Sequence, residues 1–368
     1  MAHGSSRDSS SWRRRCGACD GVAGAPPVAG EIRDSSRAGD ASIYPICCLA
    51  GERGGACAWS QAGSGCRIAF SGPDPAIASF RSVFRIAHLN LLVLLLRPFF
   101  PRRTQILVRQ NGPVSSTLSG PGSGGVLRRL HRVLYRSSDG IICQTKTMAE
   151  ELSEFTGVPL KTLAVLPNPI DIDAIRSSLH DGADEWNGSG PHLLAIGRLS
   201  REKGFDLLLN ALDKLKVRFR DADLAIAGAG REGTALGIQC GKLGLDRSVR
   251  LLGHVENPAI YFAGASLLVL SSRFEGMPNA LLEAAAGGLP IVALPASGGL
   301  VELLHGRPGI WLAREISAEA LAESLTAALQ TIQPGERYAH PWVNQFRLEQ
   351  AIPAYEELFD RTERMRPA

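Results

Sequence analysis

Residues 267–283 read Leu-Leu-Val-Leu-Ser-Ser-Arg-Phe-Glu-Gly-Met-Pro-Asn-Ala-Leu-Leu-Glu. The four apolar residues at the start predict a short buried strand, and the apolar segment that follows Pro278 predicts a helix. A strand that passes through a short polar loop into a helix is the repeating unit of a parallel sheet covered by helices. This stretch therefore predicts an α/β fold.

The same unit repeats throughout the second half of the chain. Strands are predicted at residues 193–197, 224–227, 249–252, 267–270, 291–294 and 310–312. Helices are predicted at 205–219, 231–243, 258–263, 279–286, 299–304 and 318–332. In such sheets, ligands bind beyond the carboxyl ends of the strands, close to the N-termini of helices.

The first half of the chain carries a weaker pattern. Strands are predicted at residues 68–70, 105–109, 140–143 and 163–166, and helices at 76–96, 126–135 and 147–155. Residues 1–66 show no periodicity and are predicted to be a segment of low order. We therefore expect an N-terminal domain at 67–173, a polar linker at 174–191, a second domain at 192–345 and a final crossover helix at 346–368.

Composition and charge narrow the class of protein. The 368 residues are 45% hydrophobic and carry a net charge of +4, which suits a globular chain of two domains. Between Asp74 and Asp139 there are ten arginines and no acid. Residues 81–136 thus favour contact with an anionic membrane surface or another phosphate-bearing partner, and a solvated basic face is the alternative. Nucleic acid is not an expected partner.

Cysteines and apolar runs indicate neither a metal site nor a membrane span. Cys16 and Cys19 form a lone CxxC pair without the second tight pair that a zinc site normally needs. The longest apolar run, residues 91–96, is far shorter than the ~20 residues that cross a bilayer. No secretory signal is recognisable, so a cytoplasmic location is expected, with the inner face of the membrane as an alternative.

The first informative loop follows the strand predicted at 193–197. It reads Gly197-Arg-Leu-Ser-Arg-Glu-Lys-Gly204. The planar guanidinium of Arg198 and the mobile ammonium of Lys203 could together neutralise a diphosphate without a metal. The alternative is a charged loop that merely precedes a helix.

The second loop contains Gly228, Gly230 and Gly233 in the spacing GxGxxG, and Glu256 follows further on. This spacing is typical of a dinucleotide-binding turn, which raises an NAD-dependent enzyme as an alternative. However, the motif follows the second strand of its domain, whereas the dinucleotide fingerprint normally follows the first.

The third loop carries two carboxylates. Glu275 lies in the loop after residues 267–270, and Glu283 follows seven intervening residues later, inside the predicted helix. Carboxylates suit the vicinal hydroxyls of sugar and ribose, and the amides of Asn279 and Ala280 at the helix N-terminus suit phosphate. A helix with acids in its first turns is the alternative, but it explains poorly why Glu283 stands among apolar neighbours.

Together, these motifs resemble glycosyltransferase family 4, whose members have two facing Rossmann-like domains in the GT-B fold. Gly287-Gly-Leu-Pro-Ile-Val292 and Gly298-Gly299 continue the resemblance, which covers about residues 160–365. The resemblance implies a retaining transferase that moves a hexose or N-acetylhexosamine from a nucleotide-diphosphate sugar without a metal or other cofactor. In the family, residues matching Arg198, Lys203 and Glu275 carry the chemistry. The donor would further contact Gly197, Gly230, Val255, Gly276, Met277, Asn279, Ala280 and Glu283.

The N-terminal half departs from the family pattern, so its domain is expected to be incomplete. The only candidate for the family's Gly-Gly loop is Gly54-Gly55, and where a histidine is common this chain has Arg109-Gln-Asn111. Arg109 and Asn111 are the candidates for acceptor binding. Asp171-Ile-Asp173 has the form of a metal-binding DxD motif but is more simply a loop with acids.

We therefore expect transfer to a glycan or lipid-linked acceptor in cell-surface polysaccharide synthesis, including lipopolysaccharide. A non-catalytic remnant that still binds nucleotide sugar, and a nucleotide-sugar epimerase on the same fold, are the alternatives.

Overall fold

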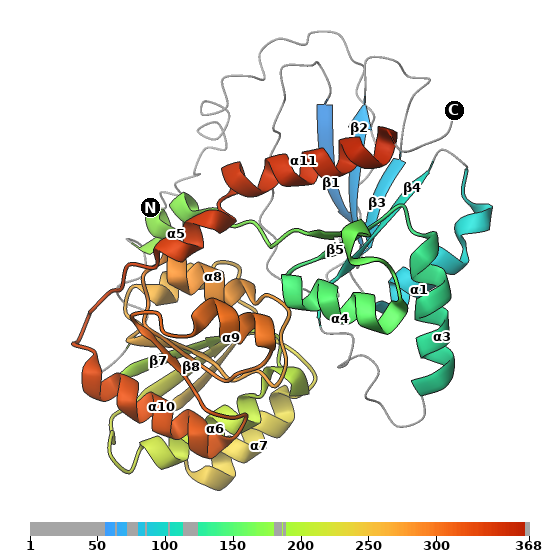
Figure 1. The fold of residues 1–368 in the computed structure, drawn as a ribbon. Coiled ribbons are helices and arrows are strands. Elements are labelled where there is room, and N and C mark those ends of the chain that lie inside the picture. Colours follow the sequence, from blue (N-terminus) through green and yellow to red (C-terminus); the bar gives the residue numbers. More distant parts are fainter. Residues whose placement is uncertain are drawn as a thin grey trace, which may run out of the picture. The chain divides into compact units, whose positions relative to one another are not determined.

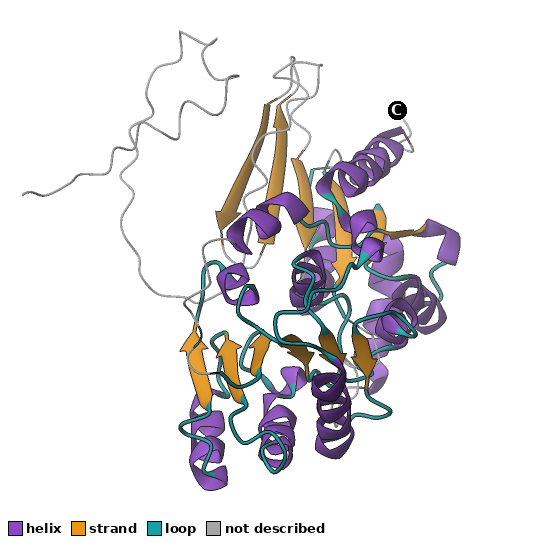
Figure 2. Cartoon of the chain, turned by 90° about the vertical axis from the view of Figure 1, so that its left-hand side faces the viewer, coloured by secondary structure: helices purple, strands orange, loops and turns teal. Residues whose placement is uncertain are grey.

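A computed structural model describes residues 56–62, 65–71, 80–84, 87–101, 104–112, 124–179, 186 and 189–364. These residues form two six-stranded sheets with helices packed beside them (Figures 1 and 2). The predicted α/β class with two domains is confirmed. Gly54-Gly55 and the pair Cys16 and Cys19 lie outside the described residues.

The second sheet is parallel throughout. Its strands are β7 (His192–Ile196), β8 (Asp223–Ala227), β9 (Val249–Gly253), β10 (Leu267–Leu270), β11 (Ile291–Ala293) and β12 (Ile310–Leu312). Their spatial order is β12-β11-β10-β7-β8-β9. The chain therefore builds outward from β7 in one direction and from β10 in the other, so the strand order reverses between these two neighbours. This point is where a doubly wound sheet opens a crevice for ligands.

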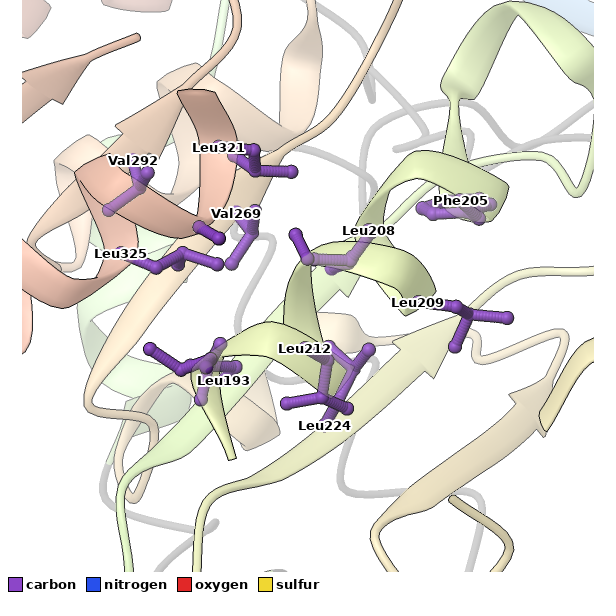
Figure 3. Close-up of a cluster of buried hydrophobic side chains, with 14 of the residues drawn as sticks. Leu193, Phe205, Leu208, Leu209, Leu212, Leu224, Val269, Val292, Leu321 and Leu325 are labelled. Carbon is purple, nitrogen blue, oxygen red and sulfur yellow. The ribbon is translucent and has the colours of Figure 1, made fainter. Parts of the chain in front are cut away.

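Helices cover both faces of this sheet. One face carries α6 (Phe205–Leu215), α7 (Gly233–Leu243) and α10 (Ala318–Thr331). The other carries α5 (Ile172–Ser178), α8 (Asn279–Ala286), α9 (Gly298–Leu304) and the 3-10 helices η8 (Pro258–Phe262) and η9 (Pro341–Phe346). Alternate strand residues serve the two faces: Leu193 joins the first core (Figure 3) and Leu194 the second. Burial on both sides explains why the strands are continuous apolar runs.

The first sheet is mixed. Its strands are β1 (Ala56–Ala62), β2 (Gly65–Ser71), β3 (Phe80–Phe84), β4 (Gln105–Gln110), β5 (Gly140–Cys143) and β6 (Leu163–Val165), in that spatial order. β1, β2 and β3 pair antiparallel, and β3 to β6 pair parallel. The spatial order of the described strands follows their order in the sequence, so this sheet lacks the reversal of strand order that the second sheet has.

The parallel part of the first sheet is also covered on both faces. One face packs against α1 (Ala87–Leu95), α3 (Gly124–Leu134) and α4 (Lys146–Thr156), with the short helices η3 (Arg97–Phe99), η4 (Tyr135–Ser137) and η5 (Leu160–Thr162) between elements. The other face receives the last helix, α11 (Leu348–Arg364), whose Leu358 and Phe359 bury against Leu107 and Ile142. The C-terminal helix thus packs on the N-terminal sheet.

Two predictions for the first half are wrong. Residues 80–84 form β3, although a helix was expected over 76–96, and the helix begins only at Ala87. The sequence does not mark the boundary between β3 and α1, because β3 is defined by pairing with β2 and β4 rather than by its own residue pattern. Residues 56–62, within the segment expected to have low order, form β1.

The linker prediction is wrong at its start. Residues up to Ser178 form α5, and Ile175 on this helix is buried in the core of the second sheet. Asp171 caps the helix by accepting a hydrogen bond from the amide of Ala174 at 2.9 Å. Asp173 pairs with Arg347 at 2.9 Å. The two acids of the Asp-x-Asp sequence therefore have structural roles in a helix start.

Candidate functional site

The candidate site lies at the switch point of the second sheet. The loop after β7 and the loop after β10 leave neighbouring strands at their carboxyl ends, and they touch at Gly204. Gly204 adopts a φ of +63°, and a Cβ there would overlap the carbonyl oxygen of Ser271. Glycine is therefore required both by the backbone conformation and by the close approach of the two loops.

Lys203 and Glu275 meet between these loops. The Lys203 Nζ donates to Glu275 Oε1 at 2.5 Å, and the hydroxyl of Ser272 donates to the same oxygen at 2.6 Å. The side chains are 21% and 11% exposed, so the ion pair is largely buried. Among the described residues, no hydrogen bond reaches the other carboxylate oxygen, Oε2. That oxygen is free to accept from a ligand hydroxyl.

Arg273 holds the two loops together. Its guanidinium forms a two-pronged pair with Asp206 at 2.7 and 2.6 Å and also donates to the carbonyl of Arg201 at 2.8 Å. The hydrogen bond from Arg273 is the main reason that the pKa of Asp206 is lowered. Sequence patterns gave no signal for this clamp, because Asp206 and Arg273 come from different strand-helix units. It fixes the 3-10 turn η7 (Arg201–Lys203) that carries Lys203.

The side chain of Arg198 is 67% exposed, and the ion pair that it forms with Glu202 is long at 3.8 Å. An exposed guanidinium with a weak partner can turn toward an anion at small cost. The two predicted cations therefore differ: Lys203 is held by an ion pair within the site, whereas Arg198 is exposed and only weakly paired.

The glycines of the GxGxxG sequence pack against the protein itself. A Cβ on Gly228 would overlap the carbonyl oxygen of Gly197, and one on Gly230 would overlap the backbone of Leu199. The amide of Leu199 donates to Ala229 at 3.0 Å, and the amide of Glu232 donates to Leu199 at 3.0 Å. These contacts account for Gly228 and Gly230 without a dinucleotide, since they seat the loop that carries Arg198.

The N-terminus of α8 offers unpaired amides. Pro278 stands at the N-cap position, and no side chain caps the helix. In the described part of the chain, the amides of Asn279 and Ala280 have no acceptor, whereas the amide of Leu281 already bonds to Pro278 at 3.2 Å. Such amides, together with the helix dipole, attract an anion such as phosphate. The helix begins at Asn279, as the sequence predicts.

Glu283 lies inside α8 and is only 3% exposed. Burial raises the pKa of its carboxyl to about 7. No hydrogen bond or ion pair to this carboxyl occurs among the described residues. A buried carboxyl without a partner is costly to ionise, and hydroxyl donors of a ligand would lower that cost.

The remaining predicted residues are spread around these loops. Gly276 is buried, and a Cβ on it would overlap the carbonyl oxygen of Asn111. Val255 is half-buried against the second core, in the loop that follows β9. Arg109, at the end of β4, is 8% exposed and donates to Asn168, with its guanidinium 5.9 Å from the ring centre of Tyr355. Arg109 is therefore internal, whereas Asn111 is exposed.

The family model for group 1 glycosyl transferases matches residues 190–331. This stretch contains both cationic and both acidic site residues. Residues 190–331 form a group 1 glycosyltransferase domain. The match ends close to Thr331, the last residue of α10, so it covers the whole second sheet.

Known proteins are similar to this chain in sequence. A glycogen synthase of Mycobacterium tuberculosis is 33% identical over 211 residues, which are 55% of this chain and 50% of that protein. A Campylobacter jejuni protein is 29% identical over 218 residues, 58% of this chain and 57% of that one. It is named as an N-acetylgalactosaminyltransferase acting on a diphospho-undecaprenol-linked sugar. The chain thus spans about half the length of the glycogen synthase.

A solved structure shows the same fold. Anabaena HepE in complex with UDP superposes with a TM-score of 0.62 at 17% identity, covering 77% of this chain and 79% of that one. At this identity the likeness concerns the GT-B fold, which the two sheets of the present chain also adopt.

Proposed function

We propose that the protein is a retaining glycosyltransferase that moves a sugar from a nucleotide-diphosphate donor to a glycan or lipid-linked acceptor. The observation that carries the proposal is the meeting of Lys203 and Glu275 at the switch point, beside the free amides of α8. A diphosphate needs positive charge and amide donors, and a sugar needs a carboxylate beside them. The site supplies both within one group 1 glycosyltransferase domain.

The donor diphosphate would lie between Lys203, Arg198 and the amides of Asn279 and Ala280. Lys203 and Arg198 would stabilise the charge that develops as the nucleoside diphosphate departs. This arrangement places the neutralising charge on side chains, so we propose that transfer proceeds without a divalent metal. Turnover that is unchanged by EDTA would support this point, and turnover restored only by Mg²⁺ or Mn²⁺ would refute it.

Glu275 would accept hydrogen bonds from the donor sugar through Oε2, and Glu283 would accept from the ribose hydroxyls. Val255, Gly197 and Gly230 would border the base and phosphates, while Gly276 and Met277 would lie beside the sugar. HepE binds UDP, so UDP is the first nucleotide to test. Whether the sugar is a hexose or an N-acetylhexosamine is decided by screening UDP-linked sugars of both kinds. Proton NMR of the product's anomeric signal tests retention.

The acceptor proposal rests on a surface of the first domain. Helices α1 and α3 pack against each other (Figure 1). Apolar side chains are exposed on α1 and in the residues that follow it (Leu92, Leu95, Leu96, Phe99 and Phe100) and on α3 (Leu130 and Val133). Phe99 is 84% exposed, and Arg129 and Arg132 on α3 and Arg136 on η4 are exposed as well. Exposed apolar side chains and exposed arginines on this pair of helices and the short helices beside them suit an anionic lipid surface.

A membrane-bound acceptor would be reached from that surface. No helix in the described ranges is long and apolar enough to cross a bilayer. The Campylobacter relative's printed name specifies a lipid-linked acceptor, which supports a role in cell-surface polysaccharide synthesis. Sedimentation with vesicles tests the surface: binding should require phosphatidylglycerol and weaken in Phe99→Ser. Equal binding to neutral and anionic vesicles would refute it.

A non-catalytic nucleotide-sugar-binding protein is the second candidate. It is favoured by the first sheet, whose described strands lack the reversal of order seen in the second sheet. Such a protein would bind a nucleoside diphosphate, and Lys203→Ala would weaken that binding, but it would release no sugar from any donor. Transfer or slow donor hydrolysis that depends on Glu275 would exclude it.

A further inference from the structure

Asn168 occupies the centre of a buried hydrogen-bond network beside the candidate site. It lies between Pro167 and Pro169, after β6, and is 7% exposed. Its side-chain oxygen accepts from Arg109 and from Gln144, the latter at 2.9 Å. Its nitrogen donates to the carbonyl of Met277 at 3.2 Å and to Asn279 Oδ1 at 2.5 Å. Both lone pairs and both protons of the amide are therefore used.

The backbone that carries Asn168 is held firmly on both sides. Pro169 restricts Asn168 to extended conformations, and each proline fixes its own φ. The hydroxyl of Tyr355 donates to the carbonyl of Pro167 at 3.2 Å, and the amide of Ile170 donates to Phe346 at 2.8 Å. Because this backbone is restrained, the Asn168 side chain can hold the groups to which it is hydrogen-bonded in place.

What Asn168 binds is the turn that begins α8. Met277 and Asn279 flank Pro278 at the helix start, so the two hydrogen bonds from Asn168 hold this turn while leaving the amides of Asn279 and Ala280 unpaired within the described part of the chain. This turn separates Glu275 from the amides of Asn279 and Ala280. Asn168 thus contacts the main chain at Met277 and the side chain of Asn279, between Glu275 and these two amides.

We infer that Asn168 is a positioning residue for the donor site: it fixes the turn 275–280 from the ends of β4 and β5. This inference rests on the proposed function, because the fixed groups are those proposed to hold the donor. Arg109 and Gln144 then act as supports that set the amide orientation of Asn168, since two donors face its oxygen. The role differs from the acceptor contact predicted for Arg109.

The test variant is Asn168→Asp. It keeps the oxygen that Arg109 and Gln144 face, and it gains an ion pair with Arg109. It replaces the donating nitrogen by an oxygen that meets the acceptor oxygens of Met277 and Asn279. The substitution thus keeps the contacts with Arg109 and Gln144 and removes the hydrogen bonds to Met277 and Asn279. Asn90→Ala is the matched control, because Asn90 is fully buried and donates to the carbonyl of Arg109 at 3.1 Å and to Tyr135 at 3.2 Å, away from α8.

Two measurements on the full chain are needed: amide hydrogen exchange by mass spectrometry, and UDP affinity by calorimetry, with GDP and dTDP as further probes. In Asn168→Asp, exchange should quicken over 275–283 and stay unchanged over 205–215, and nucleoside diphosphate affinity should fall about 10- to 100-fold. Asn90→Ala should lose thermal stability and keep its nucleotide affinity.

The two measurements separate failure of the positioning role of Asn168 from failure of the proposed function. If exchange over 275–283 and nucleotide affinity in Asn168→Asp both equal those of the wild type, the inference is overturned. Faster exchange with unchanged affinity also overturns it, since the turn would move without consequence for the donor. If the wild type binds no nucleoside diphosphate, the proposed function fails instead, and unchanged exchange would then overturn the positioning of the turn as well.

Discussion

Lys203 Nζ lies 2.5 Å from Glu275 Oε1, and these two residues come from loops that leave adjacent strands on either side of the sheet's switch point. Because Glu275 is only 11% exposed, its charge needs this partner in the absence of ligand. A diphosphate would compete for the lysine, and a sugar hydroxyl would then bind the freed carboxylate. In the proposed complex the pair would thus link the two parts of a nucleotide-sugar donor.

Lys203→Ala should weaken nucleoside diphosphate binding. Loss of a charge-assisted contact costs about 1.5–3 kcal/mol, which corresponds to roughly 10- to 100-fold in affinity. Calorimetric titration with UDP, GDP and dTDP measures the change. Lys214→Ala is the control, since Lys214 pairs with Glu319 at 3.2 Å on the outer surface between α6 and α10. Equal affinity in wild type and Lys203→Ala would contradict the diphosphate assignment.

Glu275→Ala should abolish sugar transfer, by about 100-fold or more, because the carboxylate is proposed to contact the sugar at the reacting end. Nucleoside diphosphate binding should remain or strengthen, since Lys203 loses its internal partner. Product formation by chromatography and UDP affinity by calorimetry separate the two effects. A variant that transfers sugar at the wild-type rate would remove Glu275 from the chemistry.

Glu283→Gln should change how stability depends on pH. The pKa of Glu283 is raised from 4.5 to about 7 in the fold, so the folded state holds its proton longer than the unfolded state does. Wild-type stability should therefore fall as pH rises from about 4.5 to about 7, by on the order of 1–3 kcal/mol from this group. The variant lacks this loss and should melt higher than wild type at pH 8. If the difference in melting temperature between wild type and Glu283→Gln were the same at pH 5 and pH 8, the raised pKa of Glu283 would be contradicted.

The same carboxyl predicts a pH dependence of donor binding. In the proposed donor complex ionised Glu283 would accept two hydrogen bonds from ribose, so wild-type affinity for a nucleoside diphosphate should rise as pH passes through about 7. Affinity in Glu283→Gln should be lower and should lack that rise. Titrations at pH 6 and pH 8 compare the two proteins directly, and an identical pH dependence would show that Glu283 does not meet the ribose.

Gly230→Ala distinguishes packing from dinucleotide binding. Because a Cβ would overlap the Leu199 backbone, the variant should lose about 1–3 kcal/mol of stability and displace the loop that carries Arg198. Nucleoside diphosphate affinity should fall with it, and NAD should bind neither protein. Thermal denaturation with and without each ligand provides the measurement. NAD binding to the wild type that the substitution removes would favour the dinucleotide interpretation.

Much of the second domain could be predicted because its signals are local. The strand over 267–270 and the helix Asn279–Ala286 follow from an apolar run, a proline and a glycine pair close together in sequence. Lys203 and Glu275 were predicted to share a site, since the carboxyl ends of parallel strands lie at one edge. Their direct ion pair was not, because it depends on side-chain geometry across 72 positions.

The misses have a common physical cause. β3 pairs through contacts with β2 and β4, the Arg273–Asp206 clamp joins two separate loops, and Asn168 reaches Asn279 across 111 positions. None of these leaves a periodic trace in the sequence. The start of α5 is the exception, because Asp171 before an apolar residue is a recognisable cap that the polar composition of the following segment concealed.

Calorimetric titration of the wild type with UDP, GDP, dTDP and NAD, repeated with Lys203→Ala, tests the donor site most directly. A nucleoside diphosphate should bind with one-to-one stoichiometry, the substitution should weaken its binding at least about tenfold, and NAD should not bind. Binding of NAD alone, or of no nucleoside diphosphate at all, would contradict a donor site at the switch point of the second sheet.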